Sequence, residues 1–130
     1  MTELTRLAAQ AIVDRSLEIA RERGFKPMAA VVLDARASLK AAASEDGCPI
    51  ARWKVALAKA NGAVQLGMST RRMGNLAIER PHFFAGITTM IGDAGAVPVA
   101  GGVLIRDAGG ALLGACGMSG DTSDNDEAAL

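Results

Sequence analysis

The chain has 130 residues, half of them hydrophobic, and its 14 Lys and Arg residues balance 14 Asp and Glu residues. This length fits a single domain over residues 1–130 that can bury a core. The absence of net positive charge argues against nucleic acid as a partner, because binding to phosphates needs a concentrated positive field. No apolar run is long enough to span a membrane, and the N-terminus lacks the order of a secretory signal. We therefore expect no membrane partner and a cytoplasmic location.

Small side chains dominate the apolar content, since aromatic residues make up only 3% and Tyr is absent. We expect helices and strands to approach one another closely. The apolar surplus on a neutral chain also favours a homo-oligomer, with the segment 101–105 or an exposed apolar helix face in the contact. Cys48 and Cys116 are too few for a disulfide framework and lack metal-ligand spacing. We interpret both as structural thiols.

The N-terminal third predicts a helix followed by a hairpin. Apolar residues recur at helical spacing from Leu4 to Ala20, and Gly24 is placed to end the helix. The apolar run 28–33 predicts a buried strand. Residues 34–38 then turn the chain, and 39–44 return as a weaker, Ala-rich strand.

The middle and end of the chain predict helices and then a second hairpin. A long helix over about 50–66 precedes a shorter one capped by Ser69 or Thr70. The segment 80–84 ends that stretch, and 85–95 is ambiguous. The predicted hairpin pairs 97–106 with 111–118, and a short helix ends the chain. Tight hairpins on both sides of a helical middle predict an antiparallel sheet flanked by helices, in the α+β class.

The acidic segment after the last strand is the first candidate site. Ser123 is a candidate N-cap, and the Asp126 side chain is placed to reach back to the amide of the cap. Alternatively, the bend at Ser119 and Gly120 forms the lip of a ligand pocket, and an acidic side chain such as Asp126 or Glu127 contacts the substrate. The spacing is not that of an EF-hand loop, so we expect no metal site.

Gly101 and Gly102 stand at the start of a strand, where glycine weakens a sheet unless a ligand or another backbone must approach closely. This pattern is consistent with a flat patch for a ligand or for a subunit contact. No glycine-rich loop is followed by a long helix, so a phosphate-binding loop is not supported.

His82 is the only histidine, which excludes a multi-histidine zinc site and any Cys/His cluster. Beside Pro81, Phe83 and Phe84, it is either a packed or capping residue or a functional one. The functional alternatives are an acid/base group and a single axial haem ligand, because imidazole titrates near neutral pH.

Basic residues on the long central helix are the last candidates. Arg52 and Lys59 are seven residues apart and so share one face. They form either a solvated face or, with Lys59 emerging from an Ala-rich stretch, a site for an anionic ligand. Trp53, the only Trp, is interpreted as a core or interface anchor.

Several segments resemble the GlcG/HbpS-like family, which includes the C-terminal domain of PduO-type proteins. The resemblance covers nearly the whole chain. It rests on the opening helix, Val31–Ala35, Asp46-Gly47, Lys59-Ala60, Arg80-Pro81 and, most specifically, Pro98–Glu127. It implies a profilin- or PAS-like antiparallel sheet and assembly as dimers or octamers. It also implies association with haem or corrinoid binding, glycolate-utilisation operons and redox sensing.

Two features depart from that family. Arg36 and Ala37 stand where the first reversal of the family carries a glycine pair, and the first helix lacks the histidine of haem-binding relatives. Haem is therefore suggested by the family, but its usual ligand is missing here.

These observations predict an oligomeric protein that binds a small carboxylate or carbonyl metabolite. The candidate ligand-binding residues are Lys59, Arg52, His82, Phe83, Ser119 and Gly120. One alternative is an isomerase or lyase that uses His82, Asp126 or Glu127 as the acid or base. The other is a purely structural oligomeric module.

Overall fold

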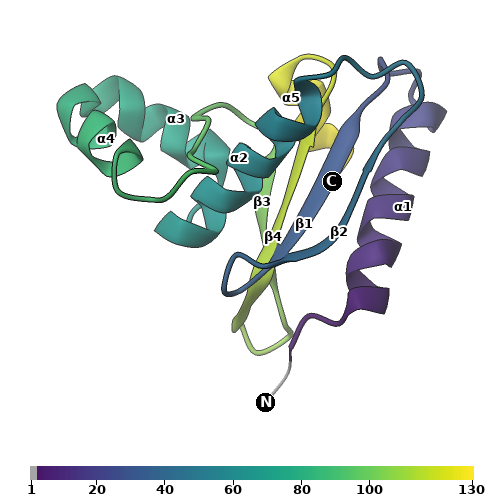
Figure 1. The fold of residues 1–130 in the computed structure, drawn as a ribbon, viewed down its shortest axis with the longest axis horizontal. Helices are drawn as coiled ribbons and strands as arrows, with labels where there is room; N and C mark the ends of the chain where they lie inside the picture. The colour runs from purple at the N-terminus through teal and green to yellow at the C-terminus, as the bar shows by residue number, and fades with distance from the viewer. Residues whose placement is uncertain (1–2) are drawn as a thin grey trace.

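The computed structural model describes residues 3–130 and shows a four-stranded sheet between helices (Figure 1). In chain order, the helices and strands are α1 (Arg6–Glu22), β1 (Ala29–Asp34), β2 (Leu39–Ser44), α2 (Arg52–Leu66), α3 (Thr70–Glu79), α4 (Pro81–Thr88), β3 (Gly102–Arg106), β4 (Leu112–Ser119) and α5 (Ser123–Ala128). The strand order is β2-β1-β4-β3, and every neighbouring pair is antiparallel. The predicted α+β class is confirmed.

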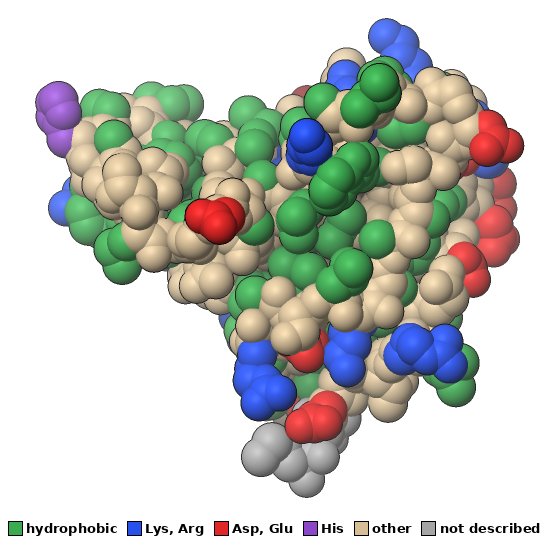
Figure 2. Space-filling view, in the orientation of Figure 1, with side chains coloured by type: hydrophobic (Ala, Val, Ile, Leu, Met, Phe, Trp, Pro, Cys, Tyr) green, Lys and Arg blue, Asp and Glu red, His purple; other side chains and the backbone are tan. Residues whose placement is uncertain are grey.

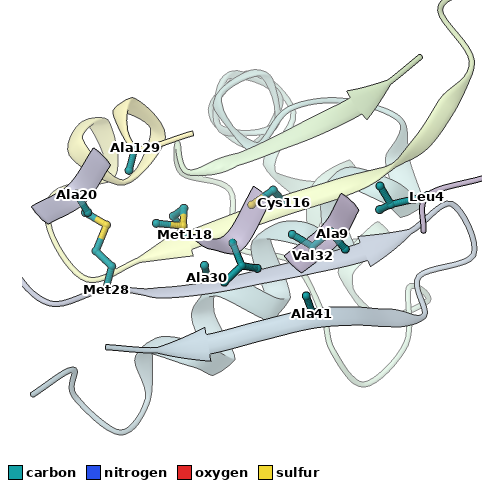
Figure 3. Close-up of a cluster of buried hydrophobic side chains, with 11 residues drawn as sticks. Leu4, Ala9, Ala20, Met28, Ala30, Val32, Ala41, Cys116, Met118 and Ala129 are labelled. Atoms are coloured by element: carbon teal, nitrogen blue, oxygen red, sulfur yellow. The ribbon is translucent and has the colours of Figure 1, made fainter. Parts of the chain in front are cut away.

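Helix α1 packs on one face of the sheet, mainly over β1 and β2. Its buried side chains are small, and Ala9, Val13 and Ala20 are completely buried. Figure 3 shows Ala9 and Ala20 over the inward-facing residues of the strands, among them Val32 and Met118. Thr5 caps the helix by accepting a hydrogen bond from the amide of Ala8 at 3.1 Å.

Helix α2 packs on the opposite face, mainly over β4 and β1. Its contact face is built from alanines that lie on the buried residues Ala29, Val31, Leu33 and Ala115. At Gly117 of β4, a Cβ atom would overlap the carbonyl oxygen of Ala56. The absence of a side chain there lets the helix backbone rest on the strand, as the small-residue composition predicts.

The termination signals act mostly as predicted. Gly24 follows α1 in a left-handed conformation with φ of 70°, as predicted, and Gly67 ends α2 in the same conformation with φ of 67°. Ser69 caps α3 by accepting a hydrogen bond from the amide of Arg72.

Three local predictions are wrong. The segment 80–84 does not end the helical stretch, because Pro81 occupies the first turn of a new helix, α4. Residues 97–101 lie outside strand β3, which begins at Gly102. Thr122, not Ser123, is the N-cap of α5, since its hydroxyl accepts from the amide of Asn125 at 3.2 Å.

Within residues 3–130, no helix combines the length and apolar character needed to cross a membrane.

Candidate functional site

A buried ion pair joins α2 to α5 at the end of β4. The Lys59 ammonium lies 3.0 Å from Oδ2 of Asp126 and donates to the carbonyl oxygen of Met118 at 2.9 Å. Both charged side chains are only 1% exposed. Burial lowers the pKa of Lys59 below its ordinary value, and the neighbouring Asp126 carboxylate opposes this shift only in part. The Lys59 amine is therefore enclosed by protein and does not open into a ligand pocket.

The glycines opposite this pair make room for it. A Cβ atom at Gly101, where φ is 125°, would lie 2.5 Å from the Lys59 nitrogen. One at Gly102 would lie 2.8 Å from the Lys59 carbonyl oxygen. The flat patch that we expected here is occupied by α2 of the same chain, so it does not offer a ligand face.

Arg52 lies two helical turns before Lys59 on the same face of α2, as the seven-residue spacing predicts. Its Nη1 donates to the Ser119 hydroxyl oxygen at 3.1 Å, and Ser119 is completely buried. Arg52 itself is only half-buried. Within residues 3–130, this is the one hydrogen bond or ion pair of the Arg52 side chain. Its other N–H groups are left to solvent or to a ligand.

Gly120 does not line a pocket. A Cβ atom at this position would overlap the carbonyl oxygen of Pro27, so Gly120 packs the end of β4 against the segment that leads into β1. The bend at Ser119 and Gly120 therefore serves packing. Of the two residues, only Ser119 contacts a side chain with exposed N–H donors, that of Arg52.

The carboxylates of the acidic segment are bound mainly by other residues of the same chain. Oδ1 of Asp126 accepts from the amide of Asp121 at 2.9 Å, so both carboxylate oxygens of Asp126 are engaged. Glu127 and Asp124 bind the Arg71 guanidinium at 3.0 and 2.6 Å. These contacts fit the interpretation of the segment as a capped helix start. The atoms differ from those predicted, because Thr122 is the N-cap and Asp126 binds the amide of Asp121. Asp126 is closed off from any substrate, and Glu127 is held by α3.

Asp121 connects the same segment to the loop between α1 and β1. Its Oδ2 accepts from the amide of Lys26 at 2.8 Å, and its Oδ1 accepts from Thr122 and Asn125. The hydrogen bonds from Lys26, Thr122 and Asn125 lower the pKa of Asp121 to about 2. This carboxylate is therefore ionised throughout the physiological pH range.

His82 and Phe83 lie on the far side of the molecule. Both are exposed on α4, which packs mainly on α3 (Figure 1). Figure 2 shows the histidine at the end of this helical projection. The Arg80 guanidinium stacks over the Phe83 ring at 4.2 Å. Within one chain, the structure does not bring His82 and Phe83 to Lys59, Arg52 and Ser119, because Pro81 starts a helix that leads away from the sheet.

The side chains that ligate haem iron in proteins do not form a site. His82 is exposed on α4, and Cys116 is 1% exposed, with burial raising its pKa to about 12. Burial also raises the pKa of Cys48, which keeps its thiol protonated. Four of the surface hollows formed by residues 3–130 have no His, Cys or Met in their linings. The residues present do not fit haem. Among the same described residues, no group of three or more His, Cys, Asp or Glu side chains is placed to hold a metal ion.

An antiparallel sheet with helices on both faces is a fold that this chain shares with several solved structures. A family model described as "Haem degrading protein HbpS-like" matches residues 4–130. The chain therefore belongs to the HbpS-like family. Among curated protein sequences, no relative matches.

Three solved structures illustrate the shared fold. HbpS is 23% identical with a TM-score of 0.84, and the match covers 99% of this chain and 86% of that one. The PduOC:heme complex is 17% identical with a TM-score of 0.84, covering 98% and 90%. Klebsiella pneumoniae protein ORFY is 20% identical with a TM-score of 0.85, covering 99% and 87%. At these identities the likeness shows the fold.

Proposed function

We propose that this chain binds a small carboxylate or carbonyl compound at the exposed side of Arg52. The observation that carries the proposal is the pairing of a half-buried guanidinium with the buried Ser119 hydroxyl at 3.1 Å. This bond fixes one edge of the guanidinium and leaves donors for a bidentate contact with a carboxylate. Membership of the HbpS-like family and the similarity to a protein solved with heme support the role of a ligand-binding protein.

Lys59 and Asp126 have a positioning role in this proposal. Their ion pair holds α2 against the end of β4, and so it places Arg52 over Ser119. The contribution of His82 and Phe83 to ligand binding then requires a second copy of the chain, because α4 points away from Arg52.

The assay is calorimetric titration of the full chain with pyruvate and lactate, as a 2-oxo and a 2-hydroxy acid. Arg52→Gln should weaken binding about tenfold, the loss expected for one charge-assisted contact. Lys54→Gln, which changes an exposed neighbouring charge, should leave binding unchanged. Equal binding by the Arg52→Gln variant and the wild type, or no saturable binding of either acid, would overturn the proposal. Native mass spectrometry of the purified protein then reports any ligand retained from the cell and the subunit number.

We also propose that the protein acts as a homo-oligomer in the cytoplasm. The α2 side of β2 is uncovered, and exposed apolar side chains gather beside it. Figure 2 shows green side chains concentrated over this part of the molecule. They include Leu39 (64% exposed), Ile50 (88%) and Trp53 (45%). Exposed apolar patches of this kind mark interaction surfaces.

Ile50→Asp should shift the protein toward a monomer in sedimentation experiments. Ile78→Asp is the matched control, because Ile78 is 82% exposed but lies on α3. A wild-type protein that sediments as a monomer at micromolar concentration and physiological salt contradicts the oligomer.

A further inference from the structure

A surface hollow lies at the opposite end of the sheet from Lys59, where β1 ends and β4 begins. Its volume is about 440 Å³, within the range of small-molecule sites. It lies near the lower end of the molecule in Figure 1, where the β1–β2 and β3–β4 turns are close to the start of α1. Its lining consists of Glu3, Leu4, Asp34, Ala35, Arg36, Lys40, Leu112 and Leu113.

Two cations of this hollow have no protein partner. Within residues 3–130, the side chains of Arg36 and Lys40 make no hydrogen bond or ion pair with another residue. Figure 2 shows Lys and Arg side chains at this end of the molecule, with Asp or Glu side chains among them. Unpaired cations beside a hollow are available to an anionic ligand.

The Asp34 carboxylate makes no ion pair with these cations, and the turn binds one of its two oxygens. Its Oδ1 accepts from the amides of Arg36 and Ser38 at 2.9 and 3.0 Å. Burial acts to raise the pKa of Asp34. The two amides and the charges of Lys40 and Arg36 outweigh this effect and hold the pKa below its ordinary value.

The turn that carries Arg36 is fixed and strained. Two backbone hydrogen bonds close it, from Asp34 to Ser38 and from Ala37 to Asp34, at 2.9 and 3.0 Å. Ala37 has a φ of 62°, in the left-handed region that disfavours any residue with a Cβ atom. Strain retained in an over-determined turn is typical of functional positions. It also keeps Arg36 beside the hollow before any ligand binds.

Apart from Glu3, the rest of the lining is apolar. Leu4 is 5% exposed, and Leu112 and Leu113 are half-buried at the start of β4. A ligand for this hollow therefore needs an anionic head and an apolar body. Glu3, exposed at the rim, would repel such a head weakly through solvent.

We propose that this hollow binds a small amphipathic anion, whose carboxylate or phosphate lies between Arg36 and Lys40 and whose apolar chain lies on Leu112 and Leu113. The site is separate from the one proposed at Arg52, since the two lie at opposite ends of β1 and β4.

Octanoate and octyl phosphate are the probes, and octanol and acetate are the controls that lack the charge or the chain. In NMR titrations of the full chain, octanoate or octyl phosphate should shift the amides of Arg36, Leu112 and Leu113. Octanol and acetate should bind at least about tenfold more weakly. The anion that binds more tightly shows whether the site prefers a carboxylate or a phosphate head.

The double variant Arg36→Gln/Lys40→Gln should weaken binding of the anionic probe about tenfold or more. The melting temperature should change little, because neither side chain makes a hydrogen bond or ion pair within residues 3–130. Lys54→Gln is the matched control. Glu3→Gln should strengthen binding of the anionic probe slightly, and a weakening instead would overturn the assignment. So would octanol binding as tightly as octanoate, an unaffected double variant, or no saturable binding of either anion.

Arg52→Gln separates this inference from the proposed function. It should leave the shifts at Leu112 and Leu113 unchanged. Loss of those shifts in Arg52→Gln, with binding retained in the double variant, would place the anion at Arg52 and overturn the site described here.

Discussion

The Lys59 ammonium and the Asp126 carboxylate lie 3.0 Å apart with both side chains 1% exposed, although 67 positions separate them in the chain. The pair connects the middle of α2 to α5, and both partners also bind backbone groups next to it. Every polar atom of the pair has a partner, as burial of charges requires. Its effect is to fix where α2 and the C-terminal segment meet.

Removing one member of this pair should destabilise the protein severely. Lys59→Met leaves the Asp126 carboxylate buried without its counter-ion, and Asp126→Asn does the same to the ammonium. Each should lower the free energy of unfolding by about 3–5 kcal/mol in urea denaturation. The double variant Lys59→Met/Asp126→Leu should lose less than the sum of the single changes, because no charge stays buried. Single variants that lose under about 1 kcal/mol would contradict a structural role for the pair.

Gly117 should tolerate no side chain. Gly117→Ala places a methyl group on the Ala56 carbonyl oxygen, so α2 must move away from β4. We expect a loss of about 2 kcal/mol or more in unfolding free energy.

Gly86→Ala is the matched control for that substitution. Gly86 lies in the exposed helix α4, and a Cβ atom there meets no atom within 4 Å. Alanine should stabilise the helix by about 0.5–1 kcal/mol. Equal effects of the two substitutions would show that α2 does not rest on Gly117 as the structure has it.

The regular elements were predictable because their signals are local. Periodic apolar residues define α1, an uninterrupted apolar run defines β1, and Gly24 and Gly67 end their helices through their own backbone freedom. The start of α4 was missed since Pro81 is compatible both with a break and with the first turn of a new helix.

The candidate site was predictable only in part. The shared face of Arg52 and Lys59 follows from helical spacing, and it is confirmed by their contacts with Ser119 and Met118 at the end of β4. The partner of Lys59 depends on how α5 folds back over the sheet, which no local pattern encodes. A lysine in an Ala-rich buried helix was nevertheless a signal, because a buried charge requires a counter-charge. The direction of α4, which separates His82 from Lys59, is likewise set by tertiary packing.

Asp121 should make stability depend on pH in the acid range. Its folded pKa, about 2, lies below its ordinary value of 3.8, because backbone amides of Lys26 and Thr122 and the Asn125 side chain bind the ionised form. A depressed carboxylate pKa contributes stability that is complete above the unfolded pKa and is lost as pH falls through the folded one. The difference in melting temperature between wild type and Asp121→Asn should therefore shrink as the pH falls from 5 toward 2. A difference that stays constant over this range would contradict the assignment.

The final prediction concerns haem, for which this chain departs from what its family description suggests. Its only imidazole lies exposed on α4, and the Cys116 thiol is buried with a pKa of about 12. Neither lines any of the four hollows described above among residues 3–130. Titration of the protein with haemin should give no sharp Soret shift of sub-micromolar affinity, and His82→Ala should not alter the titration. A tight, saturable Soret shift that survives His82→Ala would mean that haem binds through a site which these side-chain positions do not form. A tight shift that the substitution abolishes would instead assign the axial ligand to His82. A second copy of the chain would then have to enclose the porphyrin, since α4 alone offers one exposed face.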